Sequence, residues 1–321
     1  MNHLDNIKVT FCPGPGAIIN DWFVAQKEFF GRGDKEYQYI KAQTLSWIKK
    51  ISGQDEIIPI SGSATTAAMV ALNTFLTNKI LIIKTGYYSD RWFNYLKKNK
   101  KFKSLKYVNY DDFFKIRLKE RFDWIVFVYV ETASCTKYDI KKVFEKKNQL
   151  KSRLLVDATA SIGLEKNHNL ADAIFFSSCK GLFGPTGLGF IGYKKKNKLI
   201  KSNDFWFDYE THKKSLYTLG YNCMASLYAL SKNHGKYKKK LIFANQFMQP
   251  YSLLSKNKAL IGVALKNKLK RKKIKKNTII YIPRRNPGYD VIFFLGIIKL
   301  NYIQIKKVLT SRIISNLKNK N

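Results

Sequence analysis

The feature that most constrains the fold is an alternation of short apolar segments with longer amphipathic ones between residues 34 and 193. The apolar segments have the length and composition of buried strands, and they are residues 57–60, 79–84, 124–130, 153–157, 173–176 and 189–193. Helices are predicted between them, at residues 34–50, 65–75, 88–98 and 140–149. This order predicts an α/β fold with a mostly parallel central sheet sandwiched by helices. Functional side chains of such a sheet belong at the carboxyl ends of its strands.

The alternation is absent at both ends of the chain. Residues 1–20 contain Pro13-Gly14-Pro15-Gly16, which requires a turn or extended backbone, and they are interpreted as an N-terminal arm. Beyond residue 205 we expect a helix at 224–231, a strand at 278–282 and a helix at 303–317. The sequence therefore predicts a large domain over residues 21–205 and a smaller, shortened α+β domain over residues 206–321.

The positive charge of the chain has two interpretations. The 59 Lys and Arg residues against 22 Asp and Glu residues give a formal net charge of +37. Such a balance can attract nucleic acid or an anionic membrane surface. However, the lysines are spread along most of the chain, and the densest tract, residues 266–276, has no interleaved aromatic residues for base stacking. Ordinary solvent-facing lysines are therefore favoured, and nucleic-acid binding is not expected.

Other sequence features indicate a cytoplasmic protein. No apolar run approaches the roughly 20 residues that span a bilayer, and residues 1–6 lack the pattern of a signal peptide. Cys12, Cys135, Cys179 and Cys223 have neither a zinc-binding spacing nor a disulfide framework. We expect reduced thiols and no metal site.

Two charged residues follow predicted buried strands. Lys180 lies after strand 173–176, before a turn with three glycines, and Asp157 ends strand 153–157. Taken alone, Lys180 can extend its amine into solvent and Asp157 can be a helix N-cap. Together they suggest a chemistry. A lysine can form an imine with an aldehyde cofactor, and a carboxylate can keep a pyridine nitrogen protonated, so that the ring accepts electrons.

Four further motifs accompany this pair, and they are Pro13-Gly14-Pro15, Ser61-Gly62-Ser63-Ala64-Thr65, Gly86-Tyr87-Tyr88-Ser89-Asp90-Arg91 and Glu131-Thr132. With Asp157 and Lys180, they make the chain from Thr10 to about Tyr193 resemble the class V aminotransferases. This family of fold-type I pyridoxal 5'-phosphate (PLP) enzymes includes alanine–glyoxylate, serine–pyruvate and 2-aminoethylphosphonate–pyruvate aminotransferases. The motifs are specific in combination and weak singly.

The resemblance implies a role for each site residue. Lys180 would hold PLP as a Schiff base, and Asp157 would pair with its pyridine nitrogen. The phosphate would be bound by Ser63, Ala64, Thr65 and Ser177, with help from the dipole of the following helix. Tyr88 would stack on the pyridine ring, and Thr132 would donate a hydrogen bond to the ring hydroxyl or to the imine region. The bland alternatives are a helix cap for Ser63–Thr65, a core aromatic for Tyr88 and a turn residue for Thr132. Relatives of this kind are homodimers, so a homodimer is expected.

The chain departs from the family pattern at two places. Cys179 stands where many relatives have a polar residue before the lysine. Phe294 stands where relatives often have the arginine that grips the substrate carboxylate, and phenylalanine cannot replace a bidentate clamp. Arg284 or Arg285 could supply the missing cation. Adjacent strand-end residues point to opposite sides, and we favour Arg285, although two exposed arginines are the plainer alternative.

Three functions are therefore weighed. The leading one is an aminotransferase that acts on a small amino compound, such as 2-aminoethylphosphonate, alanine or serine, and a 2-oxo acid. A desulfurase or lyase on the same fold is disfavoured, because no cysteine follows Cys223 and position 179 is not histidine. The third is a basic nucleic-acid-binding protein on a degenerate enzyme fold, which the intact set of Tyr88, Asp157 and Lys180 argues against.

Overall fold

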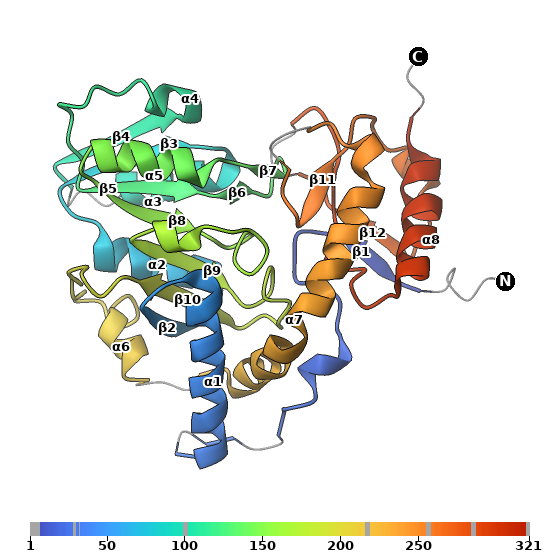
Figure 1. The fold of residues 1–321 in the computed structure, drawn as a ribbon, viewed down its shortest axis with the longest axis horizontal. Helices are drawn as coiled ribbons and strands as arrows, with labels where there is room; N and C mark the ends of the chain where they lie inside the picture. The colour runs from blue at the N-terminus through green and yellow to red at the C-terminus, as the bar shows by residue number, and fades with distance from the viewer. Residues whose placement is uncertain are drawn as a thin grey trace.

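The computed structural model describes residues 7–27, 30–31, 33–98, 102–215, 219–254, 258–283 and 287–318. The larger part is built on one sheet, and a smaller lobe lies beside it near both ends of the chain (Figure 1). The long helix α7, Tyr221–Phe247, runs from the base of the sheet to the smaller lobe. These features place the chain in the α/β class.

The central sheet has seven strands in the order β2-β10-β9-β8-β5-β3-β4. Their bounds are β2 Glu56–Ser61, β3 Lys79–Lys84, β4 Ser104–Asn109, β5 Trp124–Val128, β8 Arg153–Asp157, β9 Ala173–Ser177 and β10 Leu188–Tyr193. Strands β4, β3, β5, β8 and β9 pair in parallel, whereas β10 is antiparallel to both β9 and β2. The prediction of a mostly parallel sheet is confirmed. Pro59 lies in β2, at the edge of the sheet, where the missing N–H of proline is tolerated.

Helices cover both faces of the sheet, because successive strand residues point to opposite sides. Along β3, Leu81 and Ile83 pack in the cluster that includes buried residues of α1 (Lys35–Ser52), α5 (Ile140–Gln149) and α7. Ile80 and Ile82 pack in the second cluster, with α2 (Ala64–Phe75) and α3 (Tyr87–Lys98). The strands therefore carry continuous apolar runs, as expected for a sheet buried on both sides.

Several helix boundaries follow from local capping. Asp34 accepts hydrogen bonds from the backbone N–H groups of Glu36 and Tyr37 and starts α1, and Asp139 caps α5 in the same way. Ser63 begins α2 with a capping box. These residues satisfy N–H groups that have no partner inside the helix, so the predicted helix starts lie within a residue or two of the observed ones.

The smaller lobe joins segments from opposite ends of the chain. Strand β1 (Val9–Phe11) pairs in parallel with β12 (Thr278–Ile280), and β11 (Gly262–Ala264) pairs with β13 (Val291–Phe293). Helix α8 (Tyr302–Arg312) closes the lobe. Part of the predicted N-terminal arm is thus a strand of this lobe. The predicted domain boundaries at residues 20 and 205 stay predictions.

The short elements complete the order of the chain. They are the helices α4 (Tyr110–Phe113) and α6 (Tyr209–Lys213), the paired strands β6 (Val130–Glu131) and β7 (Thr136–Lys137), and the 3-10 turns η2 (Asn20–Trp22), η3 (His168–Leu170), η4 (Gln249–Tyr251), η5 (Arg271–Lys273) and η6 (Ile314–Asn316). Of these, β6 and η2 contribute to the functional site described next.

Candidate active site

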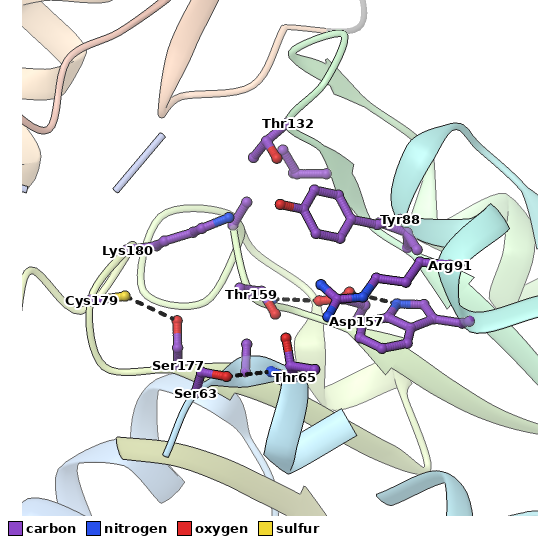
Figure 2. Close-up of a pocket in the computed structure, with 15 residues that line it drawn as sticks. Ser63, Thr65, Tyr88, Arg91, Thr132, Asp157, Thr159, Ser177, Cys179 and Lys180 are labelled. Atoms are coloured by element: carbon purple, nitrogen blue, oxygen red, sulfur yellow. Dashed lines mark hydrogen bonds between the residues drawn. The ribbon is translucent and has the colours of Figure 1, made fainter. Parts of the chain in front are cut away.

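A cavity of about 210 Å³ lies at the carboxyl ends of the central strands. It is lined by residues that follow β2, β5, β8 and β9, and by the first turns of α3 (Figure 2). All the predicted cofactor-binding residues line it, and they are Ser63, Ala64, Thr65, Tyr88, Thr132, Asp157, Ser177 and Lys180. Side chains that are far apart in sequence are therefore gathered at one place.

The loop that carries Lys180 is held from several sides. The N–H of Ser178 donates to Leu188 O at 3.0 Å, and the N–H of Gly184 donates to Ser178 O at 2.9 Å. His234 Nε2 on α7 donates to Gly181 O at 2.8 Å, and Trp22 Nε1 on η2 donates to Phe183 O at 2.7 Å. An added Cβ at Gly181 would lie 1.9 Å from Ile162 O, so only glycine allows this close approach. Lys180 therefore projects from a fixed backbone.

The amine of Lys180 extends into the cavity toward Tyr88 (Figure 2). Its Nζ lies 5.4 Å from the centroid of the Tyr88 ring. Within the described part of the chain, this amine has no carboxylate or carbonyl partner. An amine that enters a cavity and makes no ion pair or carbonyl hydrogen bond with the described residues is accessible to a ligand, and this favours a nucleophilic or proton-transfer role over a structural one.

Asp157 is buried beside the cavity at the end of β8. Its Oδ2 accepts a hydrogen bond from Trp92 Nε1 at 3.0 Å, and its Oδ1 accepts one from the N–H of Thr159 at 3.0 Å. Burial nevertheless raises the pKa of Asp157 above its ordinary value, although these bonds and the charge of Lys180 oppose the shift. A cationic partner in the cavity would stabilise the charged carboxylate.

The N-terminus of α2 points at the same cavity. Ser63 Oγ accepts a hydrogen bond from the N–H of Thr65 at 3.1 Å, and no acidic residue lies in the first turn of the helix. Across from it, Ser177 Oγ lies 3.6 Å from Cys179 Sγ. Hydroxyls and N–H groups at a helix N-terminus are suited to an anion such as a phosphate group.

Tyr88 and Thr132 are positioned by Glu131, which is fully buried. Glu131 Oε2 accepts from the N–H of Tyr88 at 2.9 Å, and Oε1 accepts from the N–H of Ala133 at 2.8 Å. Burial raises the pKa of Glu131. Glu131 does not line the cavity, whereas Thr132 does, and the buried Thr132 Oγ1 has no hydrogen-bond partner among the residues that the structure describes. Such an atom is expected to bond to a ligand.

Three polar or aromatic residues that line the cavity were not assigned a role from the sequence: Arg91, Trp92 and Thr159. The sequence does contain a signal for two of them. Arg91 and Trp92 lie three and four positions after Tyr88 on a predicted helix, and this spacing places all three side chains on the same face of the helix. Thr159 follows Asp157 by two positions, and its N–H bonds that carboxylate.

Of the positions that the sequence links to substrate binding, the structure describes Phe294 but neither of the two candidate arginines. Arg285, like Arg284, lies outside the described residues. Phe294 is fully buried in the smaller lobe, where its N–H donates to Ile261 O at 3.0 Å. The N-terminal arm reaches the site: an added Cβ at Gly14 would lie 3.1 Å from Cys179 O and 3.1 Å from Lys180 Cγ.

No group of three or more His, Cys, Asp or Glu side chains among the described residues could hold a metal ion. No helix in the described ranges combines the length and apolarity that crossing a membrane requires.

Three solved structures that superpose on this chain are aminotransferases. An aspartate aminotransferase of subgroup IV from Thermus thermophilus superposes with a TM-score of 0.79 at 14% identity, covering 96% of this chain and 100% of that one. An alanine–glyoxylate aminotransferase from Nostoc sp. gives 0.76 at 13% identity, covering 94% and 95%. A pyridoxamine–pyruvate aminotransferase from Mesorhizobium loti gives 0.79 at 13% identity, covering 94% and 90%. These likenesses show the fold.

The family itself is shown by sequence. No curated protein sequence matches the chain significantly. The family profile described as Aminotransferase class-V matches residues 25–204, which is more than half of the chain and contains every residue that lines the cavity. The chain therefore belongs to the class V aminotransferases.

Proposed function

We propose that this protein is a PLP-dependent aminotransferase that moves an amino group between a small amino compound and a 2-oxo acid. The observation that carries the proposal is the meeting of Lys180 and the buried Asp157 carboxylate on one cavity. Family membership supports the reaction type, and the identity of the substrates rests on the argument below.

The residues present fit PLP. The hydroxyls and N–H groups of Ser63, Ala64, Thr65 and Ser177 suit a phosphate, and the buried carboxylate of Asp157 suits a protonated ring nitrogen. Tyr88 would cover one face of the ring. The unpaired Thr132 Oγ1 would find its partner in the ring hydroxyl.

The mechanism assigns each side chain a task. When bound, PLP supplies an aldehyde that links to amines and a ring that takes up electrons from a substrate carbanion. Lys180 would hold the aldehyde carbon through Nζ, and its free amine would move the proton of the substrate carbon. Asp157 would keep a proton on the ring nitrogen, and Trp92 and Thr159 hold the carboxylate of Asp157 in position. Tyr88 would limit the tilt of the ring.

The choice of amino donor depends on Phe294, which stands where relatives often have an arginine that binds the substrate carboxylate. Phe294 is buried among apolar side chains and cannot bind a carboxylate. A donor without an α-carboxylate, such as 2-aminoethylphosphonate, is therefore slightly favoured over alanine or serine. The 2-oxo acid still needs a cation, and we assign this role to Arg285.

The Arg285 assignment is tested by kinetics of the Arg284→Gln and Arg285→Gln variants. The Arg285 variant should raise KM for the 2-oxo acid strongly, while the Arg284 variant stays near wild type. Wild-type constants in both variants would place the anion site elsewhere.

We further propose a cytoplasmic homodimer. Its four cysteines are free thiols, as expected in a reducing compartment. The dimer rests on the resemblance to the family, and a mass measurement in solution tests it.

The function itself is tested by absorbance spectroscopy of the PLP-loaded protein. Adding an amino donor should shift the visible band, and adding a 2-oxo acid should restore it, since each half-reaction is reversible. Candidate donors are 2-aminoethylphosphonate, alanine and serine. A desulfurase or lyase would release sulfur or an unsaturated product instead, and a nucleic-acid-binding protein would show no visible band.

A further inference from the structure

Arg91 has no role in the proposed function, although it is one of two cationic residues on the lining of the cavity, with Lys180. It lies on α3 three residues after Tyr88, so both side chains project from the same face of that helix. Figure 2 shows its guanidinium reaching across the Trp92 ring into the cavity, on the opposite side from Lys180. Its Cζ lies 5.4 Å from the centroid of the Trp92 ring.

No carboxylate pairs with Arg91 among the described residues, and the Trp92 ring is its one described partner there. The neighbouring acid, Asp90, instead accepts a hydrogen bond from Tyr107 on β4. A guanidinium that faces a cavity and has no carboxylate partner can bind an anionic ligand through its N–H donors. The cavity therefore supplies a cation that suits an anionic ligand.

The position of Arg91 identifies that anion. The amino substrate would have to reach the aldehyde carbon that Lys180 holds, and Lys180 enters from the other side of the cavity. The ring nitrogen beside Asp157 would be cationic and would repel a guanidinium. The remaining candidate with the largest negative charge is the phosphate, and the predicted phosphate donors Ser63, Ala64, Thr65 and Ser177 are all neutral. A guanidinium forks onto phosphate oxygens through two N–H donors.

We propose that Arg91 binds the phosphate group of the cofactor and supplies the positive charge that the neutral donors at the α2 N-terminus lack. This inference rests on the proposed function, because it presupposes that PLP occupies the cavity. It predicts that Arg91 matters for ligands that carry the phosphate and not for the ring alone.

The test compares the dissociation constants of PLP and of pyridoxal, which lacks the phosphate, by fluorescence and absorbance titration. Arg91→Gln should weaken PLP binding at least tenfold, about 1.4 kcal/mol, and change pyridoxal binding less than twofold. Arg91→Lys should fall between wild type and Arg91→Gln, because it keeps the charge and loses the fork.

Arg153→Gln is the matched control. Arg153 also stacks on a tryptophan, with its Cζ 5.5 Å from the Trp124 ring centroid, but it begins β8 and does not line the cavity. Both dissociation constants should stay at wild-type values in this variant, and thermal unfolding without ligand checks that every variant folds.

Two results would overturn the proposal for Arg91. An equal loss of PLP and pyridoxal affinity would assign it to the ring or to the shape of the cavity, and unchanged PLP affinity would leave it without a phosphate contact. Failure of the wild-type protein to bind PLP at all is a different result, because it rejects the proposed function and this inference with it.

Discussion

At the scale of single residues, Asp157 combines a functional advantage with a cost in stability. Burial raises the pKa of this carboxyl group, and so the folded protein without ligand resists its ionisation. A protonated pyridine nitrogen would remove that cost by pairing with the carboxylate. The same burial that destabilises the empty site would therefore strengthen the contact with the cofactor.

We predict that Asp157→Asn retains some PLP but loses more than tenfold in turnover, a barrier increase of at least about 1.4 kcal/mol. Asparagine fills the same space and cannot hold the ring nitrogen protonated. Steady-state kinetics with a responsive donor measures the loss. Near-normal rates would reduce Asp157 to a structural residue.

The same variant has a predictable effect on stability. Because folding raises the pKa of Asp157 above its ordinary value of 3.8, the unfolded chain releases this proton first. The contribution to stability is lost as pH rises above about 4. Without ligand, the stability of wild type in denaturant unfolding should therefore fall as pH rises above about 4, and Asp157→Asn, which cannot ionise, should lack this fall. A variant whose stability falls with pH as steeply as that of wild type would contradict the assigned cost.

At the scale of elements, substitution by alanine should have opposite effects on stability at a glycine in the loop after β9 and at a glycine in helix α7. Gly181→Ala places a Cβ 1.9 Å from Ile162 O and should cost about 1–3 kcal/mol of stability. Gly235 lies inside α7 with open space around its Cα, so Gly235→Ala should stabilise by about 0.5–1 kcal/mol. Chemical denaturation of both variants checks the signs. Equal effects would show that the loop moves freely.

His168, in the turn η3, should make the stability of the fold depend on pH. Its Nε2 lies 2.9 Å from Ser161 Oγ, and burial, with a smaller effect of the Lys238 charge, lowers its pKa to about 3. The unfolded chain binds the proton at higher pH, so stability falls as pH drops from about 6.5 to about 3. His168→Gln should flatten this part of the stability–pH curve. A variant curve parallel to that of wild type would contradict this cause.

At the scale of the whole molecule, the net charge of +37 raises the question whether the surface binds nucleic acid. If the lysines are solvated surface residues, a fluorescent DNA or RNA oligonucleotide should bind weakly and dissociate between about 50 and 200 mM salt. Fluorescence anisotropy measures this. Tight binding that persists at the higher salt concentration would favour a nucleic-acid function.

Features that depend on one short segment of the sequence were predicted, whereas features that depend on distant segments were not. The buried strands and the Asp157 and Lys180 positions were predicted, because apolar runs and the residues that follow them are adjacent in sequence. Edge strand β4 was not, since its half-buried residues include Lys106 and lack an apolar run. Helix α7 was predicted too short, because Gly235 and the lysines after it obscure the helical period. The pairing of β1 with β12 joins opposite ends of the chain, and no local pattern encodes it. No role was assigned to Arg91 because only the structure shows that the adjacent Asp90 accepts a hydrogen bond from Tyr107.

The central claim is that Lys180 carries the cofactor. Incubating the protein with PLP, reducing with borohydride and mapping peptides by mass spectrometry tests it directly, because reduction converts a lysine–aldehyde imine into a stable secondary amine. We expect one modified peptide with the phosphopyridoxyl group on Lys180, and none in Lys180→Ala, which should also lack turnover. A modification on another lysine, or a Lys180→Ala protein with normal activity, would contradict it.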